Sequence, residues 1–185
     1  MGLSSVKIVG SGLIGTSIGL ALSHKNVAVL MSDSNLSSAS LAQSLVDPNR
    51  NFNDTHVFDL VIIAVPPSSF SSAISKEFEL NPLSTFVDIL SIKTKPQVEV
   101  DSIPGLSEQF VGSHPMAGRE VSGAQSARGD LFIGRSWIVC PSSHASEKSV
   151  ELVKELLGLL GLLGLLGLLG LLGLLGLLGL LGLLG

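Results

Sequence analysis

Cysteine is nearly absent from this sequence, because Cys140 is the only one in 185 residues. A single cysteine excludes an intrachain disulfide, and its place in the apolar run 137–140 predicts a buried strand thiol rather than a nucleophile. Basic residues are also scarce: 11 Lys and Arg against 15 Asp and Glu give a net charge of -4. They are scattered singly, so the sequence offers no basic stripe to neutralise phosphates, and nucleic-acid binding is not expected.

Other signals are missing as well. No set of histidines and acids has the spacing of metal ligands, so no metal site is predicted. The first ten residues lack a basic stretch followed by a long apolar one, which argues against a secretory leader. Val6 stands where a myristoylation signal requires Ser or Thr. These absences favour a cytoplasmic protein without a metal.

What is present, up to about residue 155, is an alternation of short β-rich runs and helical stretches. The run 60–65 is apolar at every position, as in a strand buried on both faces, and two prolines end it. Strands are predicted at 5–9, 27–31, 60–65, 85–90, 109–112 and 136–140, with helices over 13–23, 34–46, 69–79 and from 145 onward. The pattern predicts an α/β fold, a Rossmann-type doubly wound and mostly parallel sheet.

A glycine motif follows the first predicted strand. Gly10, Gly12 and Gly15 form G-x-G-x-x-G directly before a helix. The first permits a tight turn, the second lets a diphosphate approach the backbone, and the third lets the helix pack on the sheet. Glycines that serve only a turn are the alternative, and the combination of strand, helix and a later acid argues against it.

That acid is Asp33, at the end of the second predicted strand, where it would bind ribose hydroxyls. An acid there, with no Arg or Lys nearby, favours NAD over NADP. Because ligands bind beyond the carboxyl ends of parallel strands, the residues that follow the first and third strands should line the same site. They are Leu13, Ile14, Val65 and Pro66.

Two further segments place polar side chains beyond strands. Ser91 follows the predicted strand 85–90, and His114 follows the strand 109–112 in a loop of small residues. Both can reach the cleft that would hold the nicotinamide. A histidine there can take the proton from a substrate hydroxyl while hydride leaves the same carbon, and Pro115 restricts its backbone.

These motifs together resemble the prephenate/arogenate dehydrogenases. The similar segments are G-S-G-L-I-G-T-S at 10–17, A-V-P-P at 64–67, D-I-L-S-I-K at 88–93, G-S-H-P-M-A-G at 112–118 and L-F-I-G-R-S-W-I at 131–138. The resemblance covers roughly residues 5–155. It implies NAD-dependent oxidative decarboxylation of prephenate, or of arogenate, in tyrosine biosynthesis. It also implies that His114 bonds and deprotonates the ring hydroxyl, while Ser91 orients that histidine or the substrate.

The sequence departs from the family pattern in two places. Arg119 stands where the family usually has Ser or Thr; it either binds a substrate carboxylate or is a surface charge paired with Glu120. The family is homodimeric through a helical domain that follows the cofactor domain, and nothing similar to that domain is present. We therefore divide the chain into a dinucleotide-binding domain, 1–155, and a tail, 156–185.

The tail consists of ten Leu-Leu-Gly repeats without a polar side chain. Leucine favours a helix-like tail, although a glycine at every third position costs about 1 kcal/mol each relative to alanine. Thirty apolar residues are enough to span a bilayer, and exposed leucines favour self-association. Two alternatives to an active dehydrogenase therefore stay open, an NAD-binding module without turnover and a membrane-tethered Rossmann protein.

Overall fold

A computed structural model describes residues 2–53, 55–117 and 123–161. Its centre is one sheet with the strand order β2-β1-β3-β4-β5-β6. The strands are β1 (Ser5–Val9), β2 (Ala28–Ser32), β3 (Leu60–Ile63), β4 (Thr85–Asp88), β5 (Phe110–Pro115) and β6 (Trp137–Pro141). The helices are α1 (Leu13–Ser23), α2 (Leu36–Val46), α3 (Phe70–Leu80), α4 (Thr94–Asp101) and α5 (Glu147–Leu159), with short 3-10 turns η1 (Pro67–Ser69) and η2 (Ala124–Ser126).

The sheet is parallel except at one edge. β1 lies between β2 and β3 and pairs with both in parallel, so that Val6 is opposite Val29 on one side and Leu60 on the other. β6 alone runs antiparallel, against β5. From β1 the chain therefore crosses to β2 on one side of it. It then passes back over β1 to reach β3 on the other side. This reversal makes a switch point at the carboxyl ends of β1 and β3, and the predicted mostly parallel α/β sheet is confirmed.

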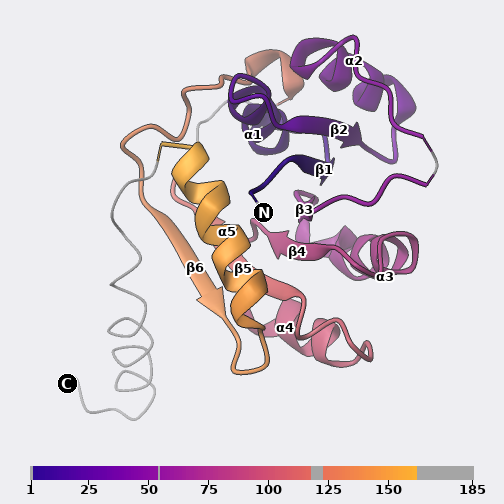
Figure 1. The fold of residues 1–185 in the computed structure, drawn as a ribbon, viewed down its shortest axis with the longest axis vertical. Coiled ribbons are helices and arrows are strands. Elements are labelled where there is room, and N and C mark those ends of the chain that lie inside the picture. Colours follow the sequence, from indigo (N-terminus) through magenta and orange to yellow (C-terminus); the bar gives the residue numbers. More distant parts are fainter. Residues whose placement is uncertain (1, 54, 118–122, 162–185) are drawn as a thin grey trace.

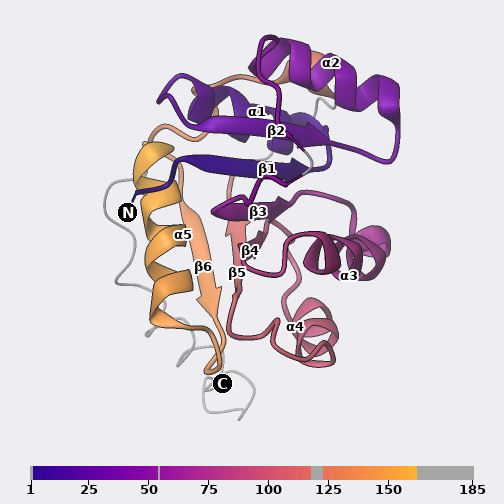
Figure 2. The same ribbon diagram turned by 45° about the vertical axis from the view of Figure 1, so that its right-hand side comes forward.

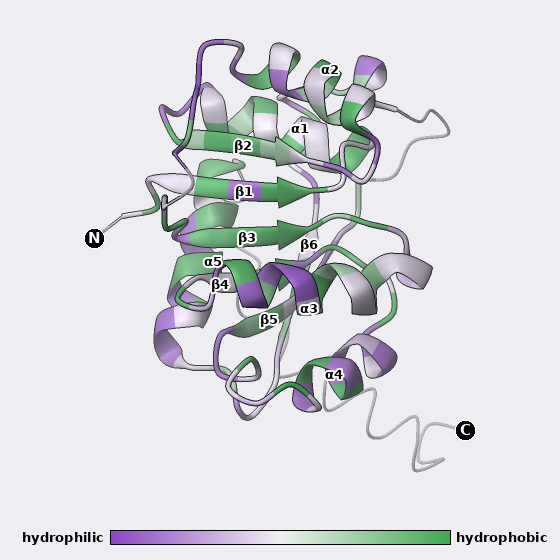
Figure 3. Cartoon of the chain, turned by 90° about the vertical axis from the view of Figure 1, so that its right-hand side faces the viewer, coloured by the Kyte–Doolittle hydropathy of each residue, from purple (hydrophilic) through white to green (hydrophobic). Residues whose placement is uncertain are grey.

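Helices cover both faces of the sheet. α3 and α4 lie on one side and α5 on the other, as Figures 1 and 2 show. Two apolar clusters fill the two layers: one joins α1, α2 and α5 to the sheet, and the other joins α3 and α4 to it. Figure 3 shows the strands as a mostly hydrophobic band between helices of mixed character. Burial on both faces explains why β3 is a continuous apolar run.

The predicted end of β5 was wrong, and the error concerns a site residue. The strand continues to Pro115, so His114 lies in a strand rather than in a loop and pairs with Ile138 of β6. The antiparallel partner extends the strand over residues whose small side chains had indicated a loop. Pro115 is tolerated there because the next hydrogen bond to the partner segment comes from the N–H of Met116, which bonds the carbonyl oxygen of Ser136, so the missing N–H of the proline is not needed.

Helix α4 was not predicted at all. Its sequence, TKPQVEVD, holds a proline and two valines, which argue against a helix by intrinsic propensity. Pro96 is in the first turn, where backbone N–H groups have no partner within the helix, so its missing donor does no harm. The buried Val100 and Pro96 fix the helix on the sheet instead.

Helix α5 incorporates the start of the Leu-Leu-Gly repeats. Ser146 caps it by accepting a hydrogen bond from the N–H of Ser149. Leu156, Leu157 and Leu160 are buried in the core cluster of that face. The folded unit thus continues past residue 155. The predictions of self-association and membrane insertion concern mostly residues 162–185, which lie outside the described residues. Over the described ranges, no helix is long and apolar enough to cross a membrane.

Candidate functional site

The three motif glycines meet different surroundings. Gly10 has a φ of 109°, and a Cβ there would lie 2.2 Å from the carbonyl oxygen of Ala64. A Cβ on Gly15 would lie 2.2 Å from the carbonyl oxygen of Gly10. A Cβ on Gly12 would meet nothing within 4 Å. Packing therefore requires Gly10 and Gly15, whereas no atom of the described residues requires Gly12; the absence of a side chain there leaves open space beside the turn.

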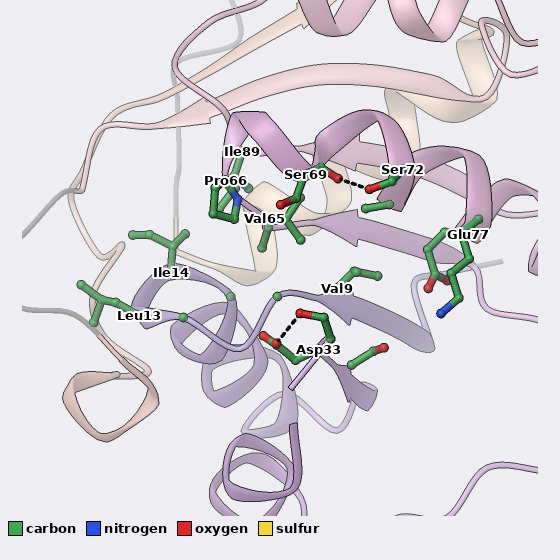
Figure 4. Close-up of a pocket in the computed structure, with 18 of the residues that line it drawn as sticks. Val9, Leu13, Ile14, Asp33, Val65, Pro66, Ser69, Ser72, Glu77 and Ile89 are labelled. Carbon is green, nitrogen blue, oxygen red and sulfur yellow. Dashed lines mark hydrogen bonds between the residues drawn. The ribbon is translucent and has the colours of Figure 1, made fainter. Parts of the chain in front are cut away.

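That space belongs to a cavity of about 930 Å³ at the switch point. All eight residues predicted to bind the cofactor line it: Gly10, Gly12, Leu13, Ile14, Gly15, Asp33, Val65 and Pro66. Figure 4 shows Leu13 and Ile14 on one side of the cavity, with Val65 and Pro66 across from them. Gly12 is the N-cap of α1 and offers no side chain to its first turn, so the N–H groups of that turn remain available for an anion.

Asp33 is held as a carboxylate at the edge of this cavity. Its Oδ2 accepts hydrogen bonds from the N–H and the hydroxyl of Ser11, at 2.8 and 2.7 Å. Its Oδ1 accepts one from the N–H of Asn35 at 2.9 Å. Partial burial acts to raise the pKa of Asp33, but the hydrogen bonds from Asn35 and Ser11 outweigh it and lower the pKa below its usual value. The group is therefore ionised at neutral pH.

The cavity also extends along α3, whose residues were not among those predicted to line it. Ser69, Ser72, Ala73, Lys76 and Glu77 line this part. Glu77 is buried, and its Oε2 lies 2.6 Å from Nζ of Lys7 on β1. Figure 4 places Glu77 at the end of the cavity away from Pro66. The signal for these residues was available, because the helix after the third strand flanks the switch point in a doubly wound sheet.

The two predicted catalytic residues do not line the cavity. Neither Ser91 nor His114 is among the residues that line it, although Ile89 is. Nδ1 of His114 lies 3.4 Å from the carbonyl oxygen of Ile89, so the half-buried imidazole adjoins the cavity through that residue. Ser91 is exposed, in the segment after β4. Arg119, the predicted substrate ligand, lies outside the described residues.

A buried ion pair, Asp88 with Lys93, lies between the end of β4 and β5, the strand that carries His114. Nζ of Lys93 contacts both carboxylate oxygens of Asp88, each at 2.6 Å. The carboxylate is fully buried. Burial raises the pKa of Asp88, with the positive charge of Lys93 opposing the rise; burial likewise lowers the pKa of Lys93 against the pull of Asp88. The opposite charge and the hydrogen bonds to the backbone of Ser113 together offset the cost of burying these two groups.

The sequence contains a signal for this pair beyond the predicted role of Ser91 in the motif D-I-L-S-I-K. An aspartate that ends an apolar strand, five residues before a lysine, is itself unusual because buried charges need partners.

Two expectations from the sequence concern the burial of Cys140 and metal binding. Cys140 lies in β6 as predicted and is half-buried; burial raises the pKa of its thiol. Across the described parts of the chain, no group of three or more His, Cys, Asp or Glu side chains is placed to hold a metal ion.

The matching family model and the curated relatives agree on one family. The model of the prephenate dehydrogenase nucleotide-binding domain matches residues 18–162. A probable prephenate dehydrogenase of Streptomyces niveus is 33% identical over 150 residues, which are 79% of this chain and 41% of that protein. The prephenate dehydrogenase of Bacillus subtilis is 30% identical over 166 residues, 83% of this chain and 43% of that protein. The chain thus spans about two fifths of the length of these curated relatives.

Solved structures share the fold. A prephenate dehydrogenase from A. aeolicus, in complex with hydroxyphenyl propionate and NAD+, superposes with a TM-score of 0.74 at 23% identity. The superposition covers 87% of this chain and 58% of that one. A Synechocystis arogenate dehydrogenase gives a TM-score of 0.70 at 22% identity, over 85% of this chain and 57% of that one.

Proposed function

This chain belongs to the prephenate dehydrogenase family, of which it carries the nucleotide-binding domain, and on that premise we propose that it binds NAD in the switch-point cavity. We propose further that it serves the oxidative decarboxylation of prephenate, or of arogenate, in tyrosine biosynthesis, a reaction of the cytoplasm. One observation carries the first part: the glycine turn, the N-terminus of α1 and the Asp33 carboxylate surround a single cavity of about 930 Å³.

The residues present fit a dinucleotide. The open space beside Gly12 admits a diphosphate against the backbone, and the first turn of α1 supplies N–H donors and the positive end of the helix dipole. The cavity volume lies within the range of small-molecule and cofactor sites. Ile14, Val65 and Pro66 give it apolar walls on either side of the turn.

Asp33 is the basis for proposing NAD rather than NADP. Its lowered pKa keeps it charged at neutral pH, where it would accept hydrogen bonds from ribose hydroxyls. A 2′-phosphate at the same place would meet a like charge in a partly buried site, which is unfavourable.

The chemistry on the substrate side divides between the cofactor and three side chains. When bound, NAD would supply the acceptor for the hydride that leaves the substrate ring. His114 would accept the proton of the ring hydroxyl, because its imidazole adjoins the cavity at Ile89. Ser91 would orient the substrate or the histidine from the segment after β4. Arg119 would bind a substrate carboxylate.

A second candidate function is an NAD-binding module without turnover. The observation that favours it is the position of Ser91 and His114, neither of which lines the cavity. In this alternative the chain binds NAD with the same residues but does not assemble a substrate site.

Calorimetric titration of the full chain with NAD tests the proposal, followed by addition of prephenate or arogenate while NADH absorbance is recorded. Binding with NADH formation is the expected result. Binding of NAD with neither substrate converted would support the module instead. No binding of NAD, in a chain shown to be folded by circular dichroism, would refute both. NADP serves as the matched control ligand, and we expect it to bind at least tenfold more weakly, the ratio that about 1.4 kcal/mol produces.

A further inference from the structure

The buried ion pair of Asp88 and Lys93 bonds the backbone of Ser113, the residue before His114. His114 is the residue to which the proposed function gives the proton transfer. We propose that Asp88 and Lys93 are positioning residues for His114. They hold the carbonyl of Ile89 against Nδ1 of the imidazole, so that Nδ1 carries the hydrogen and Nε2 is the atom that accepts the substrate's proton. This inference rests on the proposed function, in which His114 is the base.

The hydrogen bonds of Lys93 leave it no role at the substrate. Its ammonium group has three donors. Within the described structure it contacts three acceptors, the two carboxylate oxygens of Asp88 and the carbonyl oxygen of Ser113, all at 2.6 Å. No donor is left over for a substrate or a cofactor. Lys93 therefore acts on other parts of the protein, which distinguishes a positioning residue from a catalytic one.

Those parts are the two backbone segments that meet at His114. Ser113, which precedes the histidine, donates its N–H to Oδ1 of Asp88 at 2.8 Å and its hydroxyl to the backbone oxygen of Asp88 at 2.5 Å. Asp88 in turn precedes Ile89. The pair thus joins β4 to β5 at Asp88 and Ser113, which directly precede Ile89 and His114. A shift of either strand end would therefore change the contact between Ile89 and His114.

The contact favours one protonation state of the ring. A carbonyl oxygen can only accept, so a hydrogen bond across the 3.4 Å between Nδ1 of His114 and the oxygen of Ile89 forms only with the hydrogen on Nδ1. The neutral ring then has its lone pair on Nε2. Because Ile89 lines the cavity, the same carbonyl also fixes the imidazole next to the space that the proposed function gives to the cofactor.

Burial of the charges is consistent with a gain in geometry rather than in stability. A buried ion pair is often no more stabilising than well-packed apolar residues, and its best-supported benefit is a specific arrangement. Here the carboxylate is fully buried and the lysine side chain is 25% exposed. Apolar residues would fill the same volume but would make none of the bonds that join the two strands.

The test uses ring ¹⁵N chemical shifts of His114 in the full chain, without ligands, at a pH where the ring is neutral. In the wild type we expect the Nδ1–H form to predominate. In Lys93→Met we expect the ratio of Nδ1–H to Nε2–H forms to fall about fivefold, which corresponds to loss of one neutral hydrogen bond. Should that variant not fold, the charge-balanced Asp88→Asn/Lys93→Met replaces it, with the same expected fall.

Lys7→Met is the matched control. It breaks another buried ion pair, Lys7 with Glu77 at 2.6 Å, between β1 and α3 rather than β4 and β5. The tautomer ratio should stay as in the wild type, whereas a merely structural role would make both lysine variants alike. A wild-type ring protonated on Nε2, or an unchanged ratio in the folded Lys93 variants, would overturn the inference. A separate titration of the wild type with NAD tests the proposed function. Because the tautomer is measured without ligand, failure of the proposed function can be told apart from failure of this inference.

Discussion

Asp33 accepts two hydrogen bonds from Ser11, which lies 22 residues earlier in the glycine turn, and both end on the same carboxylate oxygen. The acid at the end of β2 and the turn after β1 are therefore one unit before any ligand is bound. Asp33 then has two functions in one group. It fixes the conformation of the turn and, in the proposed complex, it accepts from the ribose.

Asp33→Asn should lower stability in a pH-dependent way. The folded pKa of Asp33 lies below the 3.8 usual for an aspartate, so the stabilisation by its carboxylate is complete above pH 3.8 and is lost as the pH falls through the folded pKa. The free energy of unfolding of the wild type should therefore exceed that of the variant at neutral pH, and the two should converge in acid. Urea denaturation at a series of pH values measures this; a difference that is constant with pH would contradict the assignment.

Ser11→Ala is the control for the ligand role of the same group. It removes one donor to Asp33 but leaves the carboxylate, the N–H of residue 11 and the charge in place. Its NAD affinity should therefore fall less than that of Asp33→Asn. Equal losses in the two variants would mean that Asp33 acts only by shaping the turn.

The parts of this fold that were predictable are those where local signals agree. Glycines, a preceding strand and a following helix define one place for the turn, and α1 begins at Leu13 and ends at Ser23 as predicted. The extension of β5 to His114 depends on pairing with β6, which is distant in sequence. For Asp88 and Lys93 the sequence shows a charge at the end of an apolar strand, but their contact with each other and with Ser113 depends on how β4 and β5 pack. Tertiary contacts thus decide the part of the site proposed for catalysis more than the part proposed for the cofactor.

Gly12→Ala and Gly15→Ala should separate binding from folding. The new methyl group at position 12 meets no protein atom within 4 Å, so stability should stay within about 0.5 kcal/mol of the wild type. It would fill the space proposed for the diphosphate, so NAD affinity should fall at least tenfold. At position 15 the methyl group would lie 2.2 Å from a backbone oxygen, and the protein should lose stability. Thermal unfolding and calorimetry, applied to both variants, check the contrast; retained NAD affinity in Gly12→Ala would exclude the turn as the diphosphate site.

Lys93→Met should destabilise the fold by about 3 kcal/mol, because it leaves the buried carboxylate of Asp88 without its counter-charge. Burial already raises the pKa of Asp88, and removal of Lys93 removes the opposing charge. The folded variant therefore binds a proton that the unfolded chain releases, and its stability should decline as the pH rises from acid to neutral. Urea denaturation at several pH values checks the slope. Asp88→Asn/Lys93→Met, which has no charge to bury, should lose less stability and show no such slope from this site.

The first Leu-Leu-Gly unit gives opposite predictions for two neighbouring positions of α5. Leu156 is 1% exposed and belongs to the core cluster, so Leu156→Ala should cost about 2 to 5 kcal/mol. Gly158 is exposed within the same helix, and a Cβ there would meet nothing within 4 Å. Gly158→Ala should therefore stabilise the protein by up to about 1 kcal/mol, since alanine restricts the unfolded chain and favours the helix. Both values come from chemical denaturation of the full chain. If Leu156→Ala had no effect, the core of this face would end at residue 155 and the repeats would not contribute to it, whereas a loss in Leu156→Ala with a gain in Gly158→Ala requires that α5 continue into them.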